Sequence, residues 1–343
     1  MKKQLIATTL AAVSIASLLA GCSSSDTGST GGTTTGTTTG GDTSAPATSS
    51  VNLTLGTGGT TGTYYAVGGT MSTVLNPLMP NVTLNVASTG ASKANIIDVD
   101  AGVSHLATVQ NDVMYYAYNG TDLFLEEGAM QGFSAVAGIY DETCQIIAQP
   151  GITSVEDLRG MRVNVGDAGS GVEFNATQIL AAYGIDINED IVKSNGSFGD
   201  AADQIKDDRI DAAFVTAGAP TTAVVDLAVT NDIVLISIDA DKADALIAEY
   251  PFYTKAIIPA GTYNGVDSDV ETVSVRATLI ASPELTEDTV YELTKAMFEN
   301  QADLSSSHAK FLELDVNAAV GGIATPFHPG AAKYYAEVGV ELP

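Results

Sequence analysis

The feature that most constrains the fold is a unit of strand, small-residue loop and helix that recurs along this 343-residue chain. In the first copy, an apolar β run at residues 53–55 enters the Gly/Thr loop 56–65, and a helix is predicted over 66–75. A second copy follows, with its strand at 82–87 and its loop at 88–92. Because strands that alternate with helices form parallel sheets, the chain is predicted to be an α/β protein.

Similar units recur further along the chain. Their predicted strands and the loops or turns that follow are 105–109 with 110–112, 161–166 with 167–171, and 211–215 with 216–220. Ligands of parallel sheets bind at the carboxyl ends of the strands, where these Gly, Ser and Thr loops lie. Since such loops occur in both halves of the chain, we expect two sheets and a ligand cleft between two lobes.

Two long β runs, at residues 133–149 and 271–281, are suited to cross from one lobe to the other. The chain is therefore divided into parts as follows: a signal segment at 1–22, a tether at 23–50, the first part of lobe I at 51–139, lobe II at 140–240, and the hinge return with the second part of lobe I at 241–343.

The first 22 residues have the pattern of a bacterial export signal. Lys2 and Lys3 precede an apolar segment that is too short to span a membrane comfortably, and Leu-Ala-Gly-Cys at 19–22 resembles a lipobox. That resemblance implies lipidation of Cys22; the alternative is an ordinary signal peptide with a chance cysteine. The Ser, Thr and Gly residues of 23–50 predict a flexible tether. We therefore expect a lipid-anchored protein in the periplasm or on the cell surface.

The chain has a net charge of −27 and no basic patch in its sequence, so a nucleic-acid partner is not expected. It also disfavours long-range attraction of an anion, so an anion site has to depend on local dipoles. Without Cys22, Cys144 is left alone, which allows neither an internal disulfide nor a zinc cluster. His105, His308 and His328 lack metal-ligand spacing. No metal and no cofactor are predicted.

The loops at 56–65 and 167–171 favour an anion site, since each precedes a helix whose first N–H groups are free. The alternative for the first loop is a tight turn in which glycine only permits the backbone path. Ser170 is expected to donate to a carboxylate beside the N–H groups of Gly171 and Val172, or to cap the helix, or both. Tyr64 and Tyr65 are expected to line the ligand, or to pack elsewhere.

Catalysis is not predicted. Ser170 does not lie in a Gly-x-Ser-x-Gly turn, because Ala168 and Val172 occupy the flanking positions. The opening loop has Thr61 where a dinucleotide-binding loop has its third glycine, and no phosphate-binding lysine follows.

An ordered set of motifs resembles the TAXI family of solute receptors, which serve TRAP secondary transporters. The resemblance extends over about residues 53–339. The motifs are GTGGTTGTYY at 56–65, STGASKAN at 88–95, DLRGMRVNVG at 157–166, GSG at 169–171, IPAGTY at 258–263 and HPGAAKYY at 328–335.

The resemblance implies a two-lobed periplasmic-binding-protein fold that closes on a small organic acid, with glutamate or a related dicarboxylate as the familiar ligand. It implies delivery of this ligand to a membrane permease driven by an ion gradient. A monomer is expected. Two alternatives stay open: a binding protein of an ABC importer for another carboxylate, and a surface interaction protein outside transport.

The resemblance and the loop argument together give the predicted ligand-binding residues. They are Gly59, Thr60, Thr61, Tyr64, Tyr65, Thr89, Gly90, Ser92, Lys93, Asn95, Gln110, Ser170, Gly171, Val172, Thr216, Ala217 and Gly218. Lys93 departs from the family pattern, which has an apolar residue there. Its ammonium group is expected either in solvent or in the cleft against a second carboxylate.

Overall fold

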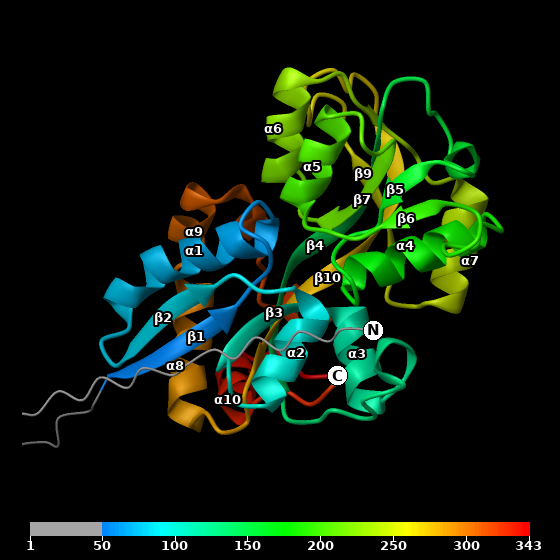
Figure 1. Ribbon diagram of the computed structural model, residues 1–343. Helices are drawn as coiled ribbons and strands as arrows, with labels where there is room; N and C mark the ends of the chain where they lie inside the picture. Colours follow the sequence, from blue (N-terminus) through cyan, green and yellow to red (C-terminus); the bar gives the residue numbers. More distant parts are fainter. Residues whose placement is uncertain (1–49) are drawn as a thin grey trace, which may run out of the picture. The chain divides into compact units, whose positions relative to one another are not determined.

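Strands and helices alternate along residues 50–343, the part of the chain that the computed structural model describes (Figure 1). The predicted signal segment, Cys22 and residues 23–49 of the predicted tether lie outside the described residues. Within residues 50–343, no helix combines the length and the apolar character needed to cross a membrane.

The strands of the described residues are β1 Val51–Gly56, β2 Val82–Ala87, β3 Leu106–Gln110, β4 Ser134–Ala148, β5 Arg162–Asn164, β6 Val192–Ser194, β7 Ala212–Ala217, β8 Val234–Leu235, β9 Thr254–Ile258 and β10 Val270–Ala281. The α-helices are α1 Thr63–Leu75, α2 Ser92–Asp100, α3 Asn111–Asn119, α4 Gly171–Ala182, α5 Phe198–Lys206, α6 Thr222–Thr230, α7 Ala240–Glu249, α8 Glu287–Glu299, α9 Gln301–Ser307 and α10 Pro329–Glu337.

The strands form one hydrogen-bonded sheet in the order β2-β1-β3-β10-β4-β7-β5-β6. β1, β2 and β3 are parallel to one another, and so are β5, β6 and β7. β4 and β10 are long antiparallel neighbours that run from one lobe into the other (Figure 1). Two separate sheets were expected. Instead, the two crossing strands pair with each other and join the lobes' strands into one ladder.

Each lobe has its own apolar core. In lobe I, the interior side chains of β1 and α1 pack with those of α8 and α10, including Leu53, Met71 and Tyr335. In lobe II, the interior side chains of β5, β7 and α4 pack together, including Ile179 and Phe214. This is the two-lobed α/β architecture of periplasmic binding proteins, as the sequence predicted.

Lobe II extends further along the chain than residue 240. Leu246, Tyr253 and Val273 are buried in the lobe II core, and the chain returns to lobe I within β10. The return lies near Arg276, because β10 pairs with β9 up to Ser274 and with β3 from Ala277 onward. The predicted crossing run at 271–281 contains this return, whereas the expected end of lobe II at 240 left α7 and β9 out of that lobe.

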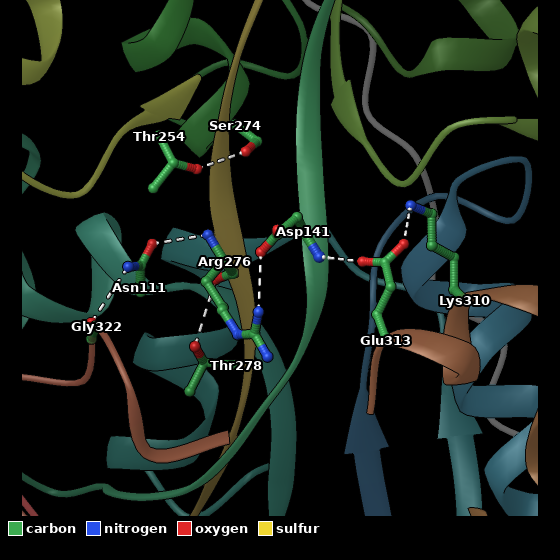
Figure 2. Close-up of polar contacts among 9 residues, drawn as sticks. All are labelled: Asn111, Asp141, Thr254, Ser274, Arg276, Thr278, Lys310, Glu313 and Gly322. Atoms are coloured by element: carbon green, nitrogen blue, oxygen red, sulfur yellow. Dashed lines mark hydrogen bonds and ion pairs between the residues drawn. The ribbon is translucent and has the colours of Figure 1, made fainter. Parts of the chain in front are cut away.

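The crossing region is held by polar contacts around Arg276 (Figure 2). Its backbone N–H donates to Asn111 Oδ1 at 3.0 Å, and its Nη1 lies 3.0 Å from Asp141 Oδ1. Glu313, in the 3₁₀ helix Ala309–Glu313, accepts from the N–H of Asp141 at 2.8 Å and pairs with Lys310 at 2.6 Å (Figure 2). These contacts tie β10 and β4 to α3 and the C-terminal part of lobe I.

Candidate ligand-binding site

A pocket lies between the lobes, with an empty volume of about 520 Å³ including its mouth. Lobe I, lobe II and the crossing strand β4 all contribute to its lining. The lining residues are Gly58, Gly59, Gly62, Thr63, Tyr64, Ala91, Ser92, Gln110, Glu142, Asp167, Ser170, Gly171, Val172, Ser197, Phe198, Thr216 and Ala217.

Four helices begin at this pocket. Lobe I contributes the starts of α1, at Thr63, and α2, at Ser92, while lobe II contributes α4, at Gly171, and α5, at Phe198. The first N–H groups of a helix have no intrahelical partner, and the helix dipole places partial positive charge there. The pocket therefore offers backbone donors to an anion from both lobes.

The lobe II helices are capped by side chains and the lobe I helices are not. Ser170 Oγ accepts from Glu173 N at 3.2 Å, and Ser197 Oγ accepts from Asp200 N at 3.2 Å. The N-cap residues of α1 and α2 are Gly62 and Ala91, which make no side-chain capping bond. The first N–H groups of α1 and α2 are thus not used by a capping side chain.

Ala91 has an unusual backbone conformation at the pocket wall, with φ 64° and ψ −150°. A residue with a Cβ rarely adopts a positive φ, and such strain persists where the surrounding structure over-determines it. Here it lets α2 begin directly at the pocket, and the Asn95 N–H bonds to the Ala91 carbonyl at 2.8 Å.

The inner wall carries a buried carboxyl group on β4. Glu142 is 2% exposed, and its Oε2 accepts from the phenol of Tyr64 at 2.6 Å. Burial raises the pKa of Glu142 well above its usual range, although the Tyr64 donor opposes this effect. Asp167 is the other carboxyl group of the lining, which contains no Lys or Arg.

A polar network joins the lobes beside the pocket. Gln110 Nε2 of lobe I donates to Asn175 Oδ1 of lobe II at 3.1 Å. Asn175 Nδ2 donates in turn to Asp112 Oδ2 at 3.1 Å and to the hydroxyl group of Tyr253 at 2.8 Å. Burial raises the pKa of Asp112 from 3.8 to about 6.

The two lobes also touch where α1 faces the β7–α6 loop. Thr63 Oγ1 donates to the Gly218 carbonyl at 2.8 Å, and Ala223 N donates to the Thr61 carbonyl at 3.2 Å. The structure is therefore a closed form, with interlobe hydrogen bonds in two separate places.

The structure brings about half of the predicted ligand-binding residues to the pocket wall. They are Gly59, Tyr64, Ser92, Gln110, Ser170, Gly171, Val172, Thr216 and Ala217. The others lie outside the lining: Thr60, Thr61, Tyr65, Thr89, Gly90, Lys93, Asn95 and Gly218.

Tyr65 was wrongly expected in the pocket lining because the start of the first helix was predicted three residues too late. α1 begins at Thr63 and not at residue 66, so both tyrosines lie in its first turn. Neighbouring helical residues point about 100° apart, so only one of them faces the pocket. Thr60 is exposed to solvent, while Thr61 and Gly218 use their carbonyls in the interlobe contacts.

Thr89 and Asn95 brace the strand ends beneath the pocket. Thr89 Oγ1 donates to Asn95 Oδ1 at 2.6 Å, and Asn95 Nδ2 donates to the carbonyls of Thr57 and Thr108 at 2.6 and 2.8 Å. Gly90 is exposed in the same loop. These residues support the wall without reaching the pocket.

Lys93 enters neither the cleft nor open solvent. Its Nζ lies 2.9 Å from Glu127 Oε1 and 2.7 Å from the Leu123 carbonyl, and its side chain is 22% exposed. It is also placed over the ring of Phe124, at 5.3 Å from the ring centre. All of these partners belong to lobe I.

The site prediction left out Gly58, Gly62, Thr63, Ala91, Glu142, Asp167, Ser197 and Phe198. Two of them had a readable signal. Ser197 and Asp200 have the spacing of a capping box, which marks the start of α5. Glu142 follows Asp141 in a β run, and two adjacent strand residues face opposite sides, so one of these acids had to face inward.

No group of three or more His, Cys, Asp or Glu side chains within residues 50–343 is arranged to hold a metal ion. The fold is that of periplasmic binding proteins, and its interlobe pocket has helix N-termini on both walls.

Comparison with known proteins gives a match to the model of the NMT1-like family over residues 55–339. The chain belongs to the NMT1-like family.

Among solved structures, a protein from Bordetella bronchiseptica RB50 has a TM-score of 0.51 and 16% identity, over 85% of this chain and 90% of that chain. It supports the fold. A substrate-binding protein of an ABC uptake transporter from Streptococcus pneumoniae with bound histidine has a TM-score of 0.48 and 15% identity, over 77% and 95% of the two chains. The alkanesulfonate-binding protein SsuA from Xanthomonas axonopodis pv. citri, bound to MOPS, has a TM-score of 0.43 and 12% identity, over 84% of each chain.

Proposed function

We propose that this protein is an extracytoplasmic receptor that captures a small organic acid in its interlobe pocket and delivers it to a TRAP-type membrane permease. Glutamate or a related dicarboxylate is the proposed ligand. No catalytic step is part of this function. The observation that carries the proposal is the convergence of four helix N-termini on a pocket without basic side chains.

The ligand is held by the pocket-lining residues that the sequence already indicated, together with the first N–H groups of α1 and α2. Closure of the lobes removes water from the carboxylate and so strengthens the hydrogen bonds to it. The lipobox-like segment supports an anchor at Cys22, with residues 23–50 as the tether to the membrane. The TAXI-like motifs support the TRAP permease as the partner.

The test is a thermal-shift screen of residues 23–343 against small organic acids and amino acids. A ligand at one hundred times its dissociation constant stabilises the folded state by about 2.7 kcal/mol, which gives a visible shift. The proposal predicts shifts with C4–C5 carboxylates. If no acid shifts the transition, and denatured samples release no bound acid, the receptor proposal is wrong.

A further inference from the structure

We infer that the ligand carries an ammonium group as well as a carboxylate, and that Glu142 binds this ammonium group. This inference rests on the proposed function and narrows its ligand class. Under it, a plain dicarboxylate of the same length binds poorly.

The placement of Glu142 on β4 is the first argument. It lies in the crossing strand at the inner wall of the pocket, while the preceding residue, Asp141, faces the other side of the strand toward Arg276. Tyr64 donates to Oε2 at 2.6 Å. Within residues 50–343, no hydrogen bond reaches Oε1. Oε1 is also not one of the fully buried side-chain atoms without a partner, so it is open to the pocket that Glu142 lines.

The distribution of acceptors is the second argument. Gln110 Oε1 lines the same pocket, is buried and has no hydrogen-bond partner within the described residues. Together with Glu142 and Asp167, it makes one set of acceptors, whereas the four helix starts make a set of donors. A dicarboxylate without an ammonium group would leave these acceptors unpaired and would place like charges together. A zwitterion satisfies both sets.

Lys310, the basic side chain whose charge acts on Glu142, does not serve a second carboxylate. Lys310 lies outside the lining, with its Nζ 2.6 Å from Glu313 and over the ring of Tyr140. Its positive charge is thus already paired.

The charge state of Glu142 gives the inference a second readout. Burial is the main cause of its raised pKa; Asp112 and Asp141 add to the shift, while Tyr64 and Lys310 oppose it. An ammonium group beside the carboxylate lowers this pKa, so binding should release protons at pH values between the pKa of the bound form and that of the free form. Calorimetry in buffers of different ionisation enthalpy measures the number of protons released.

The experiment compares each acid with its amino counterpart. The probes are L-glutamate with glutarate, L-alanine with propanoate, and L-phenylalanine with 3-phenylpropanoate, each titrated calorimetrically into residues 23–343. We expect the dissociation constant of the preferred amino acid to be lower than that of its deaminated partner by a factor of about thirty or more. Glu142→Gln should abolish that preference, and Asp141→Asn, on the opposite face of the strand, should keep it.

The outcomes separate this inference from the function beneath it. Equal or tighter binding of the deaminated acid overturns the role of Glu142 and leaves the acid receptor intact. A Glu142→Gln variant that folds and keeps the preference also overturns it. If that variant does not fold, the wild-type preference and its proton release decide. If none of the amino acids and none of the deaminated acids binds, both the inference and the proposed function are wrong.

Discussion

The hydroxyl group of Ser170 can donate one hydrogen bond and accept others, and the fold uses only its acceptor side. Its Oγ accepts from Glu173 N at 3.2 Å as the cap of α4, while the residue is 1% exposed and lines the pocket. Within residues 50–343 no acceptor takes the hydroxyl proton, so under the proposed function it is free to donate to a ligand carboxylate while Oγ caps the helix.

Ser170→Ala should therefore weaken both folding and binding. Loss of the cap costs about 1 kcal/mol of stability, and loss of a hydrogen bond to a charged group weakens binding by about tenfold. Thr286→Ala is the matched control, because Thr286 caps α8 by accepting from Thr289 N at 3.2 Å and lies outside the pocket lining. Urea unfolding and calorimetric titration measure the two effects. Equal loss of affinity in both variants would show that Ser170 acts only as a cap.

At the level of elements, the repeated strand–loop–helix pattern predicted most of the sheet and the two crossing strands. β4 and β10 lie within a residue or two of the predicted runs. The pattern did not reveal α5 or α7, although α2 and α3, helices of similar length, were predicted. Phe198, the first residue of α5, was therefore missed as a lining residue.

Local sequence signals also explain which lining residues were predicted and which were not. Ser170, Gly171 and Val172 were found because the GSG loop itself marks a helix start. Glu142 was missed because the sequence shows only that one of the adjacent acids Asp141 and Glu142 faces inward, and the apolar residues on both faces of β4 do not show which one. Thr89 and Asn95 have the polar groups of a binding site, but these groups are used to join β1 and β3 to α2.

The start of α4 meets lobe I so closely that only glycine fits there. A Cβ at position 171 would lie 1.9 Å from Gln110 Oε1 and 3.0 Å from Val113 Cγ2. The amide of Gln110 is held by Asn175 across the lobe interface, so its displacement breaks that bond. Gly171→Ala should therefore disfavour closure and weaken ligand binding by about tenfold or more.

Gly69→Ala is the control for this change. Gly69 lies within α1, and a Cβ there meets nothing within 4 Å. Alanine at this position should stabilise the protein by about 0.5–1 kcal/mol and leave binding unchanged. Small-angle scattering with and without ligand reports closure, and calorimetry reports affinity. Normal closure in Gly171→Ala would mean that Gln110 moves aside without cost.

At the level of the whole molecule, the lobes are joined by a partly buried aromatic seam as well as by the crossing strands. The rings of Tyr115 and Phe252 lie 4.9 Å apart, and those of Tyr116 and Phe174 lie 5.1 Å apart, each pair joining α3 to lobe II. Asp112 lies in this seam at 1% exposure. Because burial raises the pKa of Asp112, folding and closure of the lobes favour the protonated form of its carboxyl group.

This linkage predicts a pH dependence of stability with a definite sign. The pKa of Asp112 is about 6 in the folded protein and near 3.8 when exposed, so the folded state holds the proton more tightly. The contribution of this group to stability is greatest below pH 4 and is lost as the pH rises through 6. Between pH 5.0 and 7.5 the loss amounts to about 1.4 kcal/mol.

Asp112→Asn removes this titration, so the stability of the variant relative to wild type should rise by that amount between pH 5.0 and 7.5. The altered hydrogen bond to Asn175 adds an offset that does not depend on pH. Asp157→Asn is the control. The pKa of the exposed Asp157 is lowered by the N–H groups of Thr153 and Ser154, so the carboxylate stays ionised over this range. The difference in the free energy of unfolding between Asp157→Asn and wild type should therefore not change with pH.

Urea unfolding at four pH values measures how this difference changes with pH for each of the two variants. A flat difference for Asp112→Asn would mean that the Asp112 carboxyl group does not titrate between pH 5.0 and 7.5, and that the seam therefore does not respond to pH in this range.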